Sequence, residues 1–287
     1  MTKTDHNDTG FDDFPMSPTG GQSGRKYFES YLKTRDLIKQ IPSKIKGEND
    51  SKTLWKLFKE VNSQSGEKSV LFRKNIDAKD ALTTLWLSNI RSNAKFFIEF
   101  NQIPEFKGIS TEDLTQIAGL SVDVENIKLL PTILSQYGIV LIFEPYLAGM
   151  KLDGAVFSVE GRNAVICISL RFPRLDSLWF TLMHELAHVA LHFEHLSTPI
   201  IDDFDEITED LIEKEADKLA LNSSISRSDW RNCEAKYDLT NEAVYAFSNR
   251  VGVHPAIVAG RLRKELNRYN IFSEIVNSVD TRKVVWG

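Results

Sequence analysis

Apolar residues recur at helical spacing through much of the first hundred positions of the chain. The pattern predicts helices at residues 27–41, 51–61 and 78–100, the first ending near a proline. In the longest of them the apolar positions are Leu82, Leu85, Trp86, Ile90, Ala94, Phe97 and Ile98. We interpret Trp55 and Trp86 as anchors of helix packing, because large aromatic side chains at helical spacing usually belong to a core.

A further helix is predicted at residues 124–137, and after it the spacing of the apolar residues changes from helical to every second position. Alternating or continuous apolar residues predict strands at 139–143, 155–159 and 164–170. The last two are expected to form a hairpin through the turn at residues 160–163. The expected sheet is small and antiparallel, and the pattern does not say which strand lies at its edge.

The composition narrows the class of protein. The chain has 287 residues with 42% hydrophobic residues and a formal charge of −5. Residues 1–25 are polar and are expected to form a disordered tail. No apolar run is long enough for a membrane span, and the two cysteines, Cys167 and Cys233, suggest reduced thiols and not a disulfide framework or a metal site. A cytoplasmic protein is therefore expected.

One stretch of the helical first part is basic. Residues 26–76 contain twelve Lys and Arg against six Asp and Glu. Such a region can contact nucleic acid or an acidic partner, but a solvated helix face is the commoner explanation of this balance. We therefore expect no nucleic-acid function from charge alone.

The sequence His-Glu-Leu-Ala-His occupies residues 184–188 within an apolar stretch. Residues four apart share a helix face, so His184 and His188 can direct imidazole nitrogens at one zinc ion. Glu185 lies beside them and can serve as the general base for a water at that ion. The alternative is a core helix with two hydrogen-bonded histidines, but the long apolar surroundings favour a buried active-site helix.

A third ligand is expected from the amphipathic helix predicted at residues 209–220. Catalytic zinc usually has three protein ligands, with water in the fourth position. We assign Glu213 as the third ligand and Asp217, one turn later, as the acceptor for the outer N–H of a ligating imidazole. Glu215 is the alternative ligand, and the acidic helix as a whole is also compatible with a solvated face.

Helices are also predicted at residues 227–236, 240–250 and 254–268. His254 immediately precedes a proline at the start of the last one. It is a candidate oxyanion stabiliser, although capping its own helix is the commoner role for a residue at this position.

These segments together resemble the ImmA/IrrE family of intracellular metallopeptidases. The similarity covers about residues 80–266. Its specific motifs lie at residues 138–145, 152–157, 166–171, 178–192, 212–220 and 254–261. The resemblance implies His184, His188 and Glu213 as zinc ligands and Glu185 as the catalytic residue. The chain departs from the family at Asp217, where Asn is usual, and at residues 225–226, where an apolar residue and Pro are usual.

The resemblance implies an α+β, zincin-like metallopeptidase domain that follows a helical N-terminal unit. We expect the helical region at 26–123, the metallopeptidase domain at 124–270 and a C-terminal tail at 271–287. The implied function is zinc-dependent cleavage of a regulatory protein, a repressor or an antitoxin-like partner encoded nearby, in a stress, mobile-element or phage-defence response. The alternative is a non-catalytic antidote or sensor that uses the scaffold for protein binding.

Overall fold

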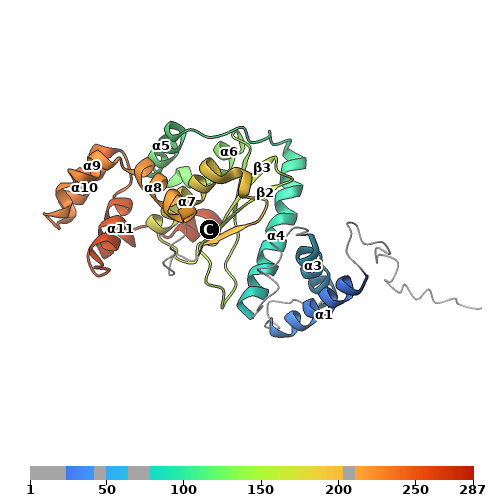
Figure 1. Ribbon diagram of the computed structural model, residues 1–287. Helices are drawn as coiled ribbons and strands as arrows, with labels where there is room; N and C mark the ends of the chain where they lie inside the picture. The colour runs from blue at the N-terminus through green and yellow to red at the C-terminus, as the bar shows by residue number, and fades with distance from the viewer. Residues whose placement is uncertain (1–23, 42–49, 64–77, 203–210) are drawn as a thin grey trace, which may run out of the picture. The chain divides into compact units, whose positions relative to one another are not determined.

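The computed structural model describes residues 24–41, 50–63, 78–202 and 211–287 (Figure 1). The chain divides into two compact units, residues 1–85 and residues 86–287. Most of the expected tail, residues 1–23, lies outside the described residues, as does part of the basic 26–76 region.

The first unit contains the helices α1 (Gly24–Gln40) and α3 (Asp50–Ser63), which pack together. Leu57 and Phe58 of α3 are almost completely buried. The ring of Phe58 meets Tyr31 of α1 edge-on, with centroids 5.8 Å apart, and Trp55 stacks on it at 5.6 Å. The two helices expected here are therefore present, and Trp55 packs on a buried ring as interpreted.

The second unit is built on a mixed sheet with the strand order β1-β3-β2-β4. The strands are β1 (Ile139–Phe143), β2 (Gly154–Val159), β3 (Asn163–Ile168) and β4 (Ile200–Asp202). β2 pairs antiparallel with β3 and β4, which confirms the hairpin, but β1 pairs parallel with β3. The expectation of a purely antiparallel sheet was therefore wrong for β1. Because β2 already has partners on both sides, β1 takes the free edge of β3.

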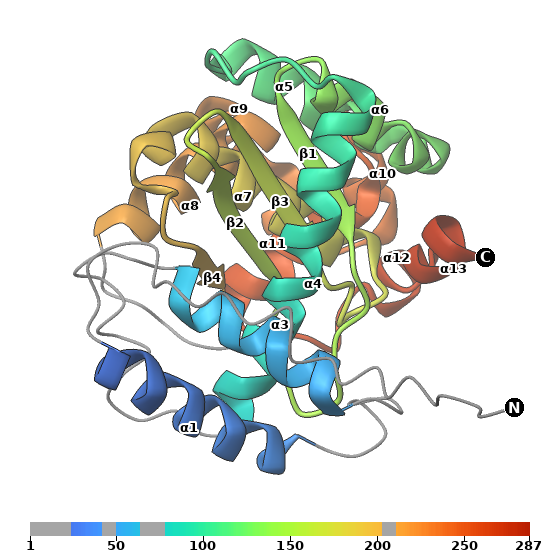
Figure 2. The ribbon, with the colours of Figure 1, turned by 90° about the vertical axis from the view of Figure 1, so that its right-hand side faces the viewer.

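Both faces of the sheet are covered, which explains why β3 is buried along its whole length. One face packs against α7 (Leu175–His192), with Ala164, Ile166 and Ile168 pointing to that side. The other packs against α4 (Ala78–Asn101) from Trp86 onward, with Val165 and Cys167 pointing to it. Figure 2 looks onto the sheet with α4 in front of it and α7 behind.

The segment between α4 and the sheet is less regular than expected. After α5 (Thr111–Gly119), the chain forms the short 3₁₀ helices η2 (Leu120–Val122) and η3 (Val124–Lys128), and then α6 (Leu130–Ser135). The single helix predicted at 124–137 was wrong. Pro131, in the first turn of α6, has no N–H to continue a helix from before it.

The remaining helices follow the α7 helix and complete the second unit. They are η4 (Phe193–His195), α8 (Leu211–Ser224), α9 (Arg227–Arg231), η5 (Glu234–Lys236), α10 (Asn241–Val251), α11 (Pro255–Leu266), α12 (Ser273–Val276) and α13 (Thr281–Trp286). Residues 271–287, expected as a tail, thus contain two short helices, and Ile275 and Val276 are buried in the core.

Candidate metal centre

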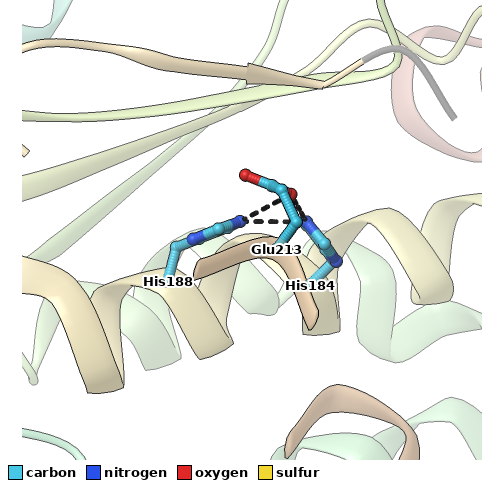
Figure 3. A group of neighbouring side chains, drawn as sticks. All are labelled: His184, His188 and Glu213. Carbon is cyan, nitrogen blue, oxygen red and sulfur yellow. Dashed lines mark hydrogen bonds and ion pairs between the residues drawn. The ribbon is translucent and has the colours of Figure 1, made fainter. Parts of the chain in front are cut away.

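The helix α7 places the two motif histidines on one face of a buried segment. His184 and His188 are 3% and 0% exposed, and their Nε2 atoms lie 2.9 Å apart (Figure 3). The separation of four residues is what brings the two rings together, since such residues are neighbours on a helix surface. The geometry expected from the motif is therefore present.

The third side chain comes from α8, which packs closely against α7 through small residues, including Ala216 and Ala220. Its first turn carries Glu213, whose Oε2 lies 3.1 Å from Nε2 of His184 and 3.4 Å from Nε2 of His188 (Figure 3). His184, His188 and Glu213 form the cluster among the described residues with the spacing to hold a metal ion.

The spacing of these three atoms fits a tetrahedral ion. With metal–ligand bonds of about 2.0–2.1 Å, two tetrahedral ligands lie about 3.3 Å apart. The three separations here are 2.9, 3.1 and 3.4 Å. Two imidazole nitrogens and one carboxylate oxygen are also the protein ligands of a common type of catalytic zinc site, in which water takes the fourth position. The residues therefore fit zinc.

The electrostatics keep the acidic member of the cluster ionised. Burial alone would raise the pKa of Glu213, but the two histidine rings more than offset this effect and lower it to about 2. The carboxylate is therefore charged at neutral pH, which is the state in which it binds a cation.

Asp217 contacts the outer nitrogen of one histidine, as expected. Its Oδ1 lies 3.0 Å from Nδ1 of His184. Partial burial opposes ionisation of Asp217, but the hydrogen bond with His184 outweighs it and lowers the pKa of Asp217. A carboxylate at this position favours the tautomer with the proton on Nδ1, so that Nε2 presents its lone pair to the cluster.

Glu185 is completely buried and lies directly against the first residue of β2. A Cβ added at Gly154 would lie 2.1 Å from Oε1 of Glu185 and 2.7 Å from Cγ2 of Thr181. Only glycine lets the strand approach the carboxylate this closely. The sequence analysis missed Gly154; the available signal was an isolated glycine at the start of a strand.

Glu215, the alternative ligand, does not join the cluster. Its Oε2 lies 3.9 Å from Nε2 of His192, one turn beyond His188 on α7. Burial lowers the pKa of His192, with a further contribution from His188. The α8 helix thus directs Glu213 and Glu215 at different histidines, because residues two apart point in different directions on a helix.

His254 caps the start of α11. Its ring atom Nδ1 accepts a hydrogen bond of 3.1 Å from the backbone N–H of Ala256. The backbone N–H of His254 donates to Oγ of Ser121. Burial lowers the pKa of His254, so the neutral, accepting form is favoured. The capping role is therefore present, while the oxyanion role stays a prediction.

The class of protein follows from three elements: the mixed sheet, the α7 helix with its buried histidines, and the acidic α8 helix. Together they form a zincin-like α+β domain, which is preceded by a helical region. The comparison with protein families gives the particular family. Residues 134–263 match the model of Peptidase_M78, the IrrE N-terminal-like domain. This part of the chain is therefore a domain of the ImmA/IrrE family, which supports a peptidase-like role. The comparison with curated proteins found no match.

None of the described helices combines the length and the apolar character that crossing a membrane requires.

Proposed function

We propose that this protein is a zinc-dependent endopeptidase. The observation that carries the proposal is the convergence of His184, His188 and Glu213, with the buried Glu185 next to His184 in the same helix, within a domain of a peptidase family. Zinc held by the three side chains would polarise the scissile carbonyl and increase the acidity of the attacking water.

The residues of the chain have separate tasks in this reaction. Glu185 accepts the proton of the attacking water and returns it to the amide nitrogen as the carbon–nitrogen bond breaks. Gly154 leaves room for this carboxylate, and Asp217 orients the ring of His184. The products are a carboxylate and an amine, and no other reactant is needed.

The substrate that we propose is a cytoplasmic regulatory protein, a repressor or an antitoxin-like partner encoded nearby. The family resemblance supports this choice, with cleavage serving a stress, mobile-element or phage-defence response. Two free, buried cysteines are compatible with a reducing compartment.

The test compares two substitutions in the purified protein. Glu185→Gln is expected to retain about one zinc per chain but to lose cleavage of the neighbouring regulator, because it removes only the general base. His188→Ala is expected to lose both, because it removes a ligand. Zinc content is measured by elemental analysis and cleavage by mass spectrometry.

Each outcome has a definite meaning. Normal cleavage by the Glu185→Gln variant would show that the proposed mechanism is wrong. A stable complex of the wild-type protein with the regulator, without any cleavage, would favour the non-catalytic binding module.

A further inference from the structure

A small pocket near the start of α7 is lined by Thr181, whose methyl group also faces the contact between Gly154 and Glu185. We call it the Thr181 pocket; its walls include Asp153, Ile168, Arg171, Phe172, Leu178 and Thr181. Thr181 lies one helical turn before Glu185 on α7, and its methyl group would touch a Cβ at position 154 just as the Glu185 carboxylate would. Thr181 thus lines the pocket and also lies near the carboxylate, which places the pocket about one helical turn before Glu185 on α7.

The position of the pocket determines which part of a substrate reaches it. In the proposed reaction Glu185 delivers a proton to the amide nitrogen that leaves, so this nitrogen must come within hydrogen-bond reach of the carboxylate. The side chain of the residue that contributes the leaving nitrogen is only two bonds from that atom. It is therefore held close to Glu185, and the Thr181 pocket, one helical turn earlier on α7, is the hollow that it can reach.

The size of the pocket limits the side chain that it can take. Its free volume, the open mouth included, is about 180 Å³, and the enclosed part has room for about one water molecule. Ile168 and Leu178 close one wall and are almost completely buried, so they cannot retreat without disturbing the core. Phe172, at 42% exposed, forms the wall that lies outside the core.

The charge of the pocket is balanced. Nε and Nη2 of Arg171 donate to the two carboxylate oxygens of Asp153 at 3.0 and 2.9 Å. Both side chains are largely buried. Because this pair matches one charge with the other, a charged substrate side chain would have to be desolvated against a neutral wall.

We propose, building on the endopeptidase function above, that the Thr181 pocket is the specificity site for the substrate residue on the amine side of the scissile bond, and that it selects a small uncharged side chain such as that of Ala or Ser. Phe172 is the residue that restricts the size of this side chain.

The wall that carries Phe172 is held by the C-terminal segment. Nε and Nη2 of Arg282 donate to the carbonyl oxygens of Leu170 and Arg171 at 2.9 and 2.7 Å. The N–H of Thr281 donates to the carbonyl oxygen of Pro173 at 3.0 Å. These bonds fix the backbone on both sides of Phe172, so Arg282 is a positioning residue for the pocket.

The test uses hydroxamates, which bind zinc through their chelating group, with a side chain placed on the amine side of that group. Three probes carry a methyl, an isobutyl or a 4-aminobutyl side chain, and calorimetry measures their binding to the zinc-loaded protein. We expect the methyl probe to bind at least about tenfold more tightly than the other two. The Phe172→Ala variant is expected to bind the methyl and isobutyl probes within about threefold of each other.

The control is Tyr237→Ala, which removes another exposed aromatic ring that does not line the pocket. It is expected to keep the wild-type preference. Zinc-loaded protein that binds all three probes equally, or none of them, would overturn the inference and leave the metal site intact. Protein that takes up no zinc would overturn the endopeptidase function and this inference with it.

Discussion

Gly154 and Glu185 meet where β2 packs on the α7 helix. The contact joins residues 31 positions apart and depends on the register of β2 relative to α7, with Gly154 opposite Ile168 of β3. The carboxylate is therefore positioned by the backbone of a strand as well as by its own helix. The position of the proposed general base thus depends on a residue that has no side chain.

The Gly154→Ala substitution tests this positioning. Its Cβ would lie 2.1 Å from Oε1 of Glu185, so the carboxylate must move by about 1 Å or more. Because a misplacement of this size can cost about a hundredfold in rate, we expect kcat/KM to fall by about that factor. Zinc content is expected to stay near one per chain. The measurement is cleavage of the regulator alongside elemental analysis.

The matched control for this substitution is Gly119→Ala. A Cβ at Gly119 would meet only the carbonyl oxygen of Gly252, at 3.9 Å, so activity should be unchanged. A Gly154→Ala variant that cleaves as fast as the Gly119→Ala variant would contradict the role of the close approach.

At the residue scale, the sequence predicted what helical periodicity controls. His184 and His188 share a face because of their spacing, and the contact of Asp217 with His184 follows from the same rule on α8. Gly154 and the pocket around Thr181 were not predicted, because they depend on how a strand packs on a helix. The catalytic and ligand roles themselves stay predictions.

At the scale of elements, the C-terminal segment stabilises the loop between β3 and α7. Leu170 in this loop has a positive φ of 49°, a conformation that is unfavourable for a branched side chain. The backbone of the loop is bonded to Arg282, and Arg174 forms an isolated β-bridge with Asp280. Residues far outside the matched domain thus hold a loop within it.

The Arg282→Ala variant should therefore weaken this loop. It removes two charge-assisted hydrogen bonds from a partly buried side chain, so we expect the free energy of unfolding to fall by about 1–3 kcal/mol. Amide exchange at Arg171, Phe172 and Arg174 should become faster, and the preference for the methyl over the isobutyl probe should shrink. Urea unfolding, hydrogen exchange and calorimetry measure these three effects.

The neighbouring Lys283→Ala variant serves as its control, because the Lys283 side chain is 83% exposed. It is expected to behave as the wild type does in all three measurements. Equal stability and equal probe preference of the two variants would contradict the positioning role of Arg282.

Most elements of the fold were predictable from hydrophobic periodicity, and their pairing was not. The helices α1, α3 and α4 and the strands β1, β2 and β3 occur where the pattern predicts them. The parallel pairing of β1 with β3 was missed because an apolar strand has the same pattern in either direction. The short β4 was missed because three residues are too few to show a period.

At the scale of the whole molecule, the second unit has one large apolar core. Residues of α7, β3 and α11 bury a continuous apolar cluster, with Leu182, Leu186 and Ile166 fully buried. Burial of this surface supplies the main driving force for folding. The metal centre lies at one edge of this packing, between α7 and α8.

Removal of zinc should therefore lower stability without unfolding the protein. Ligand binding to the folded state stabilises it by about 4 kcal/mol at a free concentration a thousand times Kd, so a chelator is expected to lower Tm by several degrees. Circular dichroism at 25 °C should keep its helical signal. Glu213→Gln, with a weakened site, should show a smaller change of Tm on chelation than the wild type. Loss of the helical signal on chelation, or no change of Tm, would contradict this view.

The proposed metal ligands come from two helices, and this division has a consequence for the folding of the newly made chain. His184 and His188 are paired as soon as α7 forms, whereas Glu213 arrives only when α8 docks on it. A nascent chain thus offers a divalent ion two donors first and a third later, so metal affinity rises in two stages as folding proceeds. The visible spectrum of cobalt(II) changes with its coordination. The time course of this change during refolding would therefore show when α8 docks on α7.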